Sequence, residues 1–212
     1  MNMKKIYLFT RFERFWHWCQ AAIILMLLFT GFEIHGNVHF FGFKKAVELH
    51  NLLGQTWAIL FVFIIFWLLT TGEWRQYIPT SKKLFEVVLY YSFGIFKGLP
   101  HPVPKSKTAK HNPLQRLTYL GLTAILLNLQ MATGLLYFLY NDWPIWGWTF
   151  LDLRLLALIH LTSAFAILTF VIVHVYMATT GHSVTSYFVA MITGWEEVDE
   201  GEVADWEIQS RP

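Results

Sequence analysis

The chain has 212 residues, of which 55% are hydrophobic, 18% aromatic and only 14% charged, with a formal net charge of +2. Soluble domains average about 25% charged residues, so the composition excludes an ordinary soluble domain, and no nucleic-acid partner is expected. The one cysteine, Cys19, excludes an intrachain disulfide and a cysteine-based metal motif. Any metal chemistry must therefore fall to histidine.

In chain order, four stretches are nearly free of charged residues over about the 20 residues that a membrane-spanning helix requires. They predict spans at residues 15–34, 49–71, 117–140 and 155–179. We therefore expect an all-α, integral membrane four-helix bundle over residues 1–200, followed by an acidic tail at residues 201–212. The carboxylates between Glu196 and Glu207 are expected to be solvated.

Lysine and arginine are unevenly placed along the chain. Four precede the first span and eight lie between residues 72 and 116, whereas the other two loops hold three in total. The positive-inside rule predicts that both chain ends and the long middle loop are cytoplasmic. Residues 84–96 in that loop are apolar but too short to span, and we expect an interfacial helix there. The alternative, a fifth span, would place the tail outside.

Four of the nine histidines lie in or at the mouths of the predicted spans. An ionisable group inside a membrane is a functional hypothesis by default. His160 and His174 are fourteen residues apart, so they face nearly the same side of one helix, about 21 Å apart along its axis. By their expected depth in the membrane, His17 pairs with His174 near the inner face, and His50 pairs with His160 near the outer face. The fourth span thus supplies one imidazole to each of two stacked sites.

Two imidazoles per level suit haem iron with two axial nitrogens. Zinc requires four protein ligands, or three and a water, so it fits poorly. Small residues at Gly31, Gly54 and Gly134 would admit a flat macrocycle, although they also permit close helix packing. Haem propionates need cations at the membrane edge; the candidates, which could equally contact lipid headgroups, include Arg11, Arg14 and Arg116.

Several motifs resemble the bacterial di-haem cytochrome b family, the membrane subunits of thiosulfate reductases, formate dehydrogenases and nickel–iron hydrogenases. They are "RFERFWHW", "LHNLLG", "KHNPLQRLTY", the His160–His174 pair and "TGHSVTSYFVAMITGWEEV", and the resemblance covers residues 7–200. It implies two haem b groups, the inner bound by His17 and His174 and the outer by His50 and His160. This agrees with the pairing obtained from depth.

The resemblance also implies a site for menaquinone or ubiquinone beside the inner haem, formed by His111, Asn112 and Gln115. The same residues have a structural interpretation. Asn112 suits a helix N-cap, Pro113 the first helical position and Gln115 the reciprocal capping position. Capping and quinone binding can coexist. A proton relay near this site would use His111 or Glu13, and the sequence does not select between them.

The function expected from this set is electron transfer across the bacterial cytoplasmic (inner) membrane, as a subunit of a respiratory oxidoreductase complex. Electrons would pass between the quinone pool and an extracytoplasmic iron–sulfur, multihaem or hydrogenase-type partner, which we expect at His35, His39 and the loop at residues 141–148. One alternative is a stand-alone superoxide:quinone oxidoreductase. Another is a passive membrane anchor, which leaves the four histidines unexplained.

Overall fold

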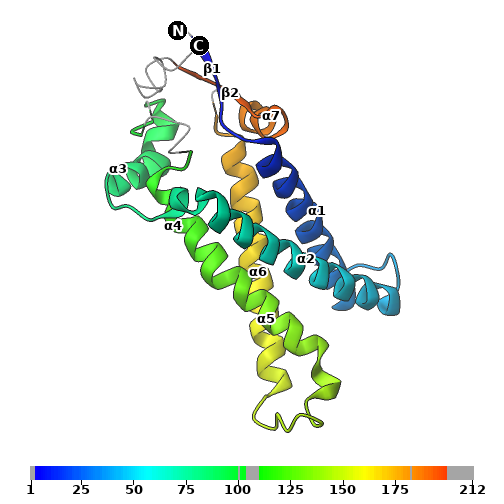
Figure 1. Cartoon of the computed structure of the whole chain (residues 1–212). Helices are drawn as coiled ribbons and strands as arrows, with labels where there is room; N and C mark the ends of the chain where they lie inside the picture. The colour runs from blue at the N-terminus through cyan, green and yellow to red at the C-terminus, as the bar shows by residue number, and fades with distance from the viewer. Residues whose placement is uncertain (1–2, 100, 104–109, 182, 200–212) are drawn as a thin grey trace. The chain divides into compact units, whose positions relative to one another are not determined.

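The structure is a computed structural model, and it describes residues 3–99, 101–103, 110–181 and 183–199 (Figure 1). Within them the chain is mostly helical. The elements are β1 (Met3–Tyr7), α1 (Arg11–Ile34), α2 (Phe43–Thr71), η1 (Glu73–Tyr77), α3 (Leu84–Leu89), η2 (Tyr90–Gly94), η3 (Ile95–Lys97), α4 (Pro113–Gly121), η4 (Leu122–Leu126), α5 (Leu127–Phe138), η5 (Tyr140–Asp142), α6 (Leu153–Ala178), α7 (Ser186–Thr193) and β2 (Trp195–Asp199).

Four helical stretches among the described residues are long and apolar enough to cross a membrane: Arg11–Ile34, Phe43–Thr71, Pro113–Phe138 and Leu153–Ala178. The predicted fold class, an all-α membrane protein with four spans, is confirmed. The helices begin up to six residues before the predicted spans, because polar first turns extend them beyond the apolar stretch. The third is continuous through a π-helical turn, η4, between α4 and α5.

The start of α1 shows how a polar first turn is fixed. Thr10 Oγ1 accepts a hydrogen bond from the Glu13 backbone N–H at 3.3 Å, and the Glu13 carboxylate accepts one from the Thr10 N–H at 2.7 Å. This reciprocal capping box satisfies donors that the first turn of a helix otherwise leaves unpaired. The helix therefore starts four residues before the apolar stretch.

The middle loop contains the short helix expected at residues 84–96. Helix α3, the π-helical segment η2 and the 3₁₀ segment η3 follow one another from Leu84 to Lys97. Val87 and Gly94 are buried, whereas Phe85, Phe93 and Phe96 are exposed. One face is thus packed and the other presents aromatic rings, the pattern of a helix that lies on an apolar surface. Its depth at a membrane remains a prediction.

A two-stranded sheet was not predicted. Strands β1 and β2 pair antiparallel, with Met3 opposite Asp199 and Tyr7 opposite Trp195, and they lie side by side in Figure 1. The expectation that the carboxylates from Glu196 onward are solvated is wrong for Glu196, which is 4% exposed within β2. The predicted tail at residues 201–212 lies outside the described residues.

The chain divides into two compact units, which are described separately below. The first unit comprises Met1–Arg14, Leu68–Leu122 and His174–Pro212; the second comprises Phe15–Trp67 and Thr123–Val173. The sheet, the middle-loop helices and α7 belong to the first unit. Most of α1, α2 and α6, together with α5, belongs to the second.

Candidate functional site

Two imidazoles face each other within the second unit. The ring of His50, on α2, and the ring of His160, on α6, have centroids 6.4 Å apart and planes at 74°. A metal ion held between two imidazole nitrogens, each at about 2 Å, separates the ring centroids by about 6 Å. Among the described residues, no group of three or more His, Cys, Asp or Glu side chains could hold a metal ion. The pair thus fits an iron whose other ligands come from a macrocycle.

The His50 ring is held by the last turns of α1. Its Nδ1 lies 2.8 Å from Thr30 Oγ1, and Thr30 is fully buried. A Cβ built on Gly31 would lie 3.8 Å from His50 Cε1. Gly31 therefore lies beside the imidazole, at a distance where a Cβ would make ordinary van der Waals contact.

The His160 ring is held in the same way by α5. Its Nδ1 lies 3.0 Å from Thr133 Oγ1, and its Nε2 lies 3.1 Å from Gln130 Nε2. Ser163 donates a hydrogen bond to Gln130 Oε1. A Cβ on Gly134 would lie only 3.1 Å from His160 Cε1. Each imidazole thus meets polar groups of a neighbouring helix, and of the two glycines Gly134 is the one where a Cβ would crowd the ring.

Sequence reasoning missed the polar residues of this site. Thr30, Gln130, Thr133 and Ser163 are isolated polar residues inside apolar stretches, and two of them precede the glycines that the sequence singled out. The dipeptide Thr-Gly occurs five times in the sequence, so it does not by itself single out these two positions. The third glycine, Gly54, has no atom within 4 Å of a built Cβ, so nothing in its packing requires a small residue.

The predicted inner pair is distributed over both units. His17 lies on α1 in the second unit, where its ring meets the Trp18 ring edge-on at 5.2 Å. His174 lies near the end of α6 in the first unit. Both occupy the helices and helix ends that the sequence predicted. Their assignment as ligands of one iron stays a prediction.

A second cluster lies in the first unit, around His111. The His111 ring lies 5.3 Å from the Tyr77 ring and 5.0 Å, edge-on, from the Tyr119 ring. Burial lowers the pKa of His111 to about 4, and the neighbouring Lys110 ammonium acts in the same direction. Burial also raises the pKa of Tyr77. At neutral pH the cluster therefore presents an uncharged imidazole between two phenols.

Glu13, the other candidate for a proton relay, is tied to Lys110. The Lys110 ammonium lies 2.7 and 3.0 Å from the two carboxylate oxygens of Glu13, and the side chains are 6% and 20% exposed respectively. Thr10 donates two more hydrogen bonds to the carboxylate. The carboxylate is thus held by one ion pair with Lys110 and by two hydrogen bonds from Thr10.

The capping interpretation of Asn112 and Gln115 is present in the structure. Asn112 Oδ1 accepts from the Gln115 N–H at 2.9 Å, and Gln115 Oε1 accepts from the Asn112 N–H at 3.0 Å. Asn112 Nδ2 also donates to the Tyr91 hydroxyl at 3.1 Å. Both amide oxygens are thus used in starting α4, so a ligand here would meet the amide N–H groups.

The arginines predicted to bind propionates differ in their contacts. Arg14 donates to the Ile192 carbonyl and, at 3.4 Å, to the Thr10 carbonyl. Arg116 Nε donates to the His111 carbonyl at 3.0 Å, and Arg11 is exposed. Arg14 and Arg116 therefore serve the local structure of the first unit, while their propionate role stays a prediction.

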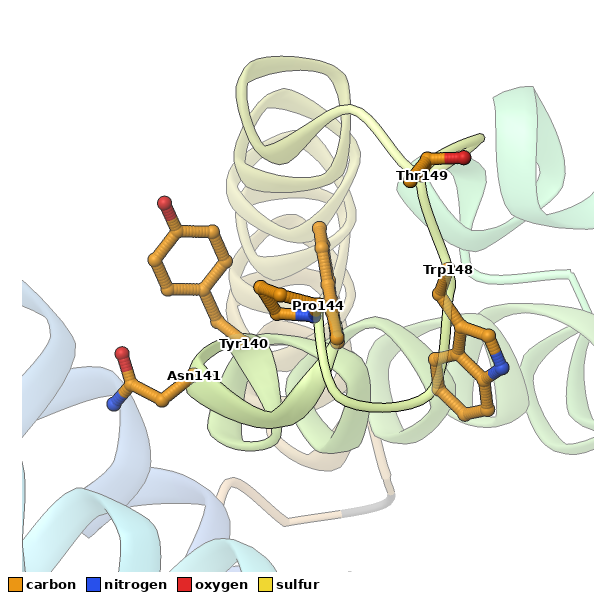
Figure 2. Close-up of a pocket in the computed structure, with 6 residues that line it drawn as sticks. Tyr140, Asn141, Pro144, Trp148 and Thr149 are labelled. Atoms are coloured by element: carbon orange, nitrogen blue, oxygen red, sulfur yellow. The ribbon is translucent and has the colours of Figure 1, made fainter.

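The loop between α5 and α6 forms a shallow aromatic pocket of about 300 Å³. Figure 2 shows Tyr140 and Trp148 on either side of Pro144, with Thr149 further along the loop. Trp143 is buried and donates from Nε1 to the Leu136 carbonyl at 3.1 Å, which fixes the loop to the end of α5. The neighbouring side chains of Ile145 and Phe150 are 78% and 79% exposed.

Four membrane-length helices among the described residues, with an imidazole pair between two of them, are the arrangement expected of a membrane b-type cytochrome. The chain belongs to the prokaryotic cytochrome b561 family, whose model matches residues 8–194. It is 32% identical over 200 residues to a protein of Escherichia coli (strain K12) named cytochrome YdhU, covering 91% of this chain and 75% of that protein. It is 25% identical over 202 residues to a protein of Rhizobium leguminosarum bv. viciae named as a Ni/Fe-hydrogenase B-type cytochrome subunit, covering 84% and 82%.

Membership of this family fixes the general function. The protein is a multi-pass membrane cytochrome that carries b-type haem and acts in electron transfer. This confirms the family and the kind of cofactor that the sequence predicted. The number of haems, their ligands, the quinone and the redox partner belong to the proposal below.

Proposed function

We propose that the protein is a di-haem b-type cytochrome, the membrane subunit of a respiratory oxidoreductase complex that transfers electrons between an extracytoplasmic redox partner and the quinone pool. His50 and His160 hold the outer haem, and His17 and His174 hold the inner one. The observation that carries the proposal is the 6.4 Å separation of the His50 and His160 rings. When bound, each haem supplies a one-electron carrier.

The quinone site is assigned to the His111 cluster. A neutral imidazole accepts a hydrogen bond, and then a proton, from a quinol hydroxyl, and the lowered pKa of His111 keeps it neutral. The Tyr77 and Tyr119 rings offer apolar walls, while the N–H groups of Asn112 and Gln115 can donate to a quinone oxygen. Glu13 is ion-paired with Lys110, and we assign the role of proton acceptor to His111. The substrate is menaquinone or ubiquinone.

The orientation follows from charge and from the sheet. Pairing of β1 with β2 holds residues 3–7 and 195–199 together, which requires an even number of crossings between them and supports four spans over five. The positive-inside rule then places the cationic middle loop and both ends of the chain on the cytoplasmic side of the inner membrane. The outer haem faces the periplasm, close to the loop at residues 140–150.

The redox partner is assigned to that extracytoplasmic face. A relative named as a hydrogenase cytochrome subunit supports a partner of iron–sulfur, multihaem or hydrogenase type. The exposed apolar side chains of Ile145 and Phe150, beside the pocket of Figure 2, offer contact area for it.

The test is a haem-to-protein ratio and a reduced-minus-oxidised spectrum on detergent-purified protein, repeated after addition of a menaquinol analogue. Two b-type haems per chain, with at least one reduced by the quinol, are expected. A normal haem content without quinol reduction contradicts the quinone role. Rapid reduction by superoxide without a partner would instead favour the stand-alone oxidoreductase, and a chain without haem would leave only the anchor.

A further inference from the structure

Two threonines occupy equivalent positions against the two imidazoles of the outer pair. Thr30, on α1, lies 2.8 Å from His50 Nδ1, and Thr133, on α5, lies 3.0 Å from His160 Nδ1. Both threonines are buried, with 0% and 4% exposure. Each precedes the glycine that lies beside the same ring. One Thr-Gly pair thus meets each histidine from a neighbouring helix.

The direction of these hydrogen bonds follows from the other contacts of the threonines. Thr30 Oγ1 donates back to the Met26 carbonyl at 2.8 Å, and Thr133 Oγ1 donates to the Leu129 carbonyl at 2.7 Å. A hydroxyl has one proton, and when that proton is donated to the carbonyl, the threonine offers a lone pair to the ring. The imidazole Nδ1–H is then the donor.

A second backbone carbonyl supports the same assignment. The Leu27 and Gln130 carbonyls, three positions before Thr30 and Thr133 respectively, each lie 3.1 Å from the threonine hydroxyl. A carbonyl can only accept a hydrogen bond, so two acceptors of its own helix are within reach of each hydroxyl proton.

The Gln130 amide lies close to both nitrogens of His160. Its Nε2 is 3.3 Å from Nδ1 and 3.1 Å from Nε2 of the ring, and Ser163 donates to Gln130 Oε1. Because this amide is close to both ring nitrogens, the tautomer is assigned from Thr133 alone. Iron binding at Nε2 requires the Gln130 amide to turn away from that nitrogen.

We propose that Thr30 and Thr133 are positioning residues that hold His50 and His160 as Nδ1–H tautomers and leave both Nε2 atoms for the haem iron. The inference rests on the proposed ligand assignment. An Nδ1–H group that donates to an oxygen makes the imidazole a stronger electron donor and fixes its orientation. The two hydrogen bonds therefore stabilise ferric iron and lower the reduction potential of the outer haem.

The test replaces each threonine with the isosteric Thr30→Val and Thr133→Val, and with the hydroxyl-retaining Thr30→Ser and Thr133→Ser. The readouts are the midpoint potential in a redox titration, the low-spin electron paramagnetic resonance signal and haem retention. The valine variants should shift the potential of the outer haem upward and weaken haem retention about 10–100-fold. The serine variants should keep the parental values.

Matched controls are Thr56→Val on α2 and Thr169→Val on α6. Both threonines are exposed and donate back to a carbonyl of their own helix, Leu52 at 2.8 Å and Phe165 at 2.9 Å. They share the helix geometry of Thr30 and Thr133 without the contact to histidine. Their potentials and haem retention should match the parent protein.

Unchanged potential and resonance signal in both valine variants would overturn the inference. If a valine variant retains no haem, the serine variant at the same position decides between two explanations. Parental haem content and potential in the serine variant support the hydrogen bond. Loss of haem in the serine variant as well points to the threonine methyl group and overturns the inference. The ligand assignment is tested separately by His50→Ala and His160→Ala. If these keep two haems with parental spectra, the proposed function fails at this site, whatever the threonine variants show.

Discussion

At the scale of single residues, replacing histidines separates the two predicted haems. His50→Ala and His160→Ala should each leave one haem per chain, and a quinol should still reduce it. His17→Ala and His174→Ala should remove the other haem together with quinol reduction. The measurement is haem content with quinol-driven reduction in detergent.

The exposed loop residue His39 provides the control, because His39→Ala should retain both haems. Four alanine variants that all keep two haems would contradict the ligand assignment.

His111 makes stability depend on pH. Its pKa is lowered in the folded protein to about 4 from an ordinary value of 6.5. Between these values the unfolded chain binds the proton and the folded chain does not, so stability rises with pH. The contribution is therefore complete above about pH 6.5 and lost as the pH falls to about 4, a change of order 1–3 kcal/mol.

Thermal unfolding followed by circular dichroism across this range measures the effect. His111→Phe keeps an aromatic ring between Tyr77 and Tyr119 but cannot titrate, so its unfolding temperature should fall less between pH 6.5 and pH 4. Equal slopes for the two proteins would count against the buried, neutral imidazole.

The residues of the outer pair also mark how far sequence alone reaches. Expected depth and spacing predicted that His50 and His160 form a pair, because a helix has a fixed rise per residue and sequence position therefore gives depth in the membrane. Their partners Thr30 and Thr133 lie 20 and 27 residues away on other helices. Which faces meet depends on helix rotation, and no pattern within one span encodes that rotation.

At the scale of elements, the start of α4 tests capping against quinone binding. Asn112→Ala removes the N-cap and should lower stability by about 0.5–2 kcal/mol. Asn112→Asp keeps an oxygen that can cap, so stability should be retained, but the amide N–H donors are lost. Reduced quinol oxidation in Asn112→Asp with parental haem spectra is the expected result.

Unfolding temperature and quinol-driven haem reduction, measured on the same samples, distinguish the two roles. Gln115→Leu, which cannot return the capping bond to the Asn112 N–H, is the matched comparison. Parental quinol kinetics in Asn112→Asp would leave capping as the only role of this residue.

The spans were predictable and the sheet was not, for one physical reason. A span of about 20 apolar residues is a local requirement of the bilayer, so α1, α2, α5 and α6 can be recognised without their neighbours. Strands β1 and β2 have five residues each, and their pairing joins segments about 190 residues apart. Nothing in "MKKIY" or in "WEEVD" identifies the other as its partner.

At the scale of the whole molecule, the sheet can be tested by crosslinking. Lys5 and Glu197 are directly opposite each other, and opposed Cα atoms in an antiparallel pair lie about 4.5–5.5 Å apart, within the range of a disulfide. In a Cys19→Ser background, Lys5→Cys with Glu197→Cys should form an intrachain disulfide on mild oxidation. Altered gel mobility that dithiothreitol reverses is the readout.

The control pairs Lys5→Cys with Glu196→Cys. Glu196 is opposite Ile6 and points to the other face of the strand, so this pair should crosslink poorly. Equal crosslinking of both pairs would show that the observed register is not the one in the membrane.

The register of the sheet also sets an order of events during synthesis. Strand β1 leaves the ribosome before the four apolar helices, and the last residue of its partner lies 192 positions after Tyr7, at Asp199. At a synthesis rate of about 5–20 residues per second, β2 is completed roughly 10–40 s after β1. All four apolar helices are translated and delivered to the membrane in that interval, so the strands can close only on a chain whose last span has already been made.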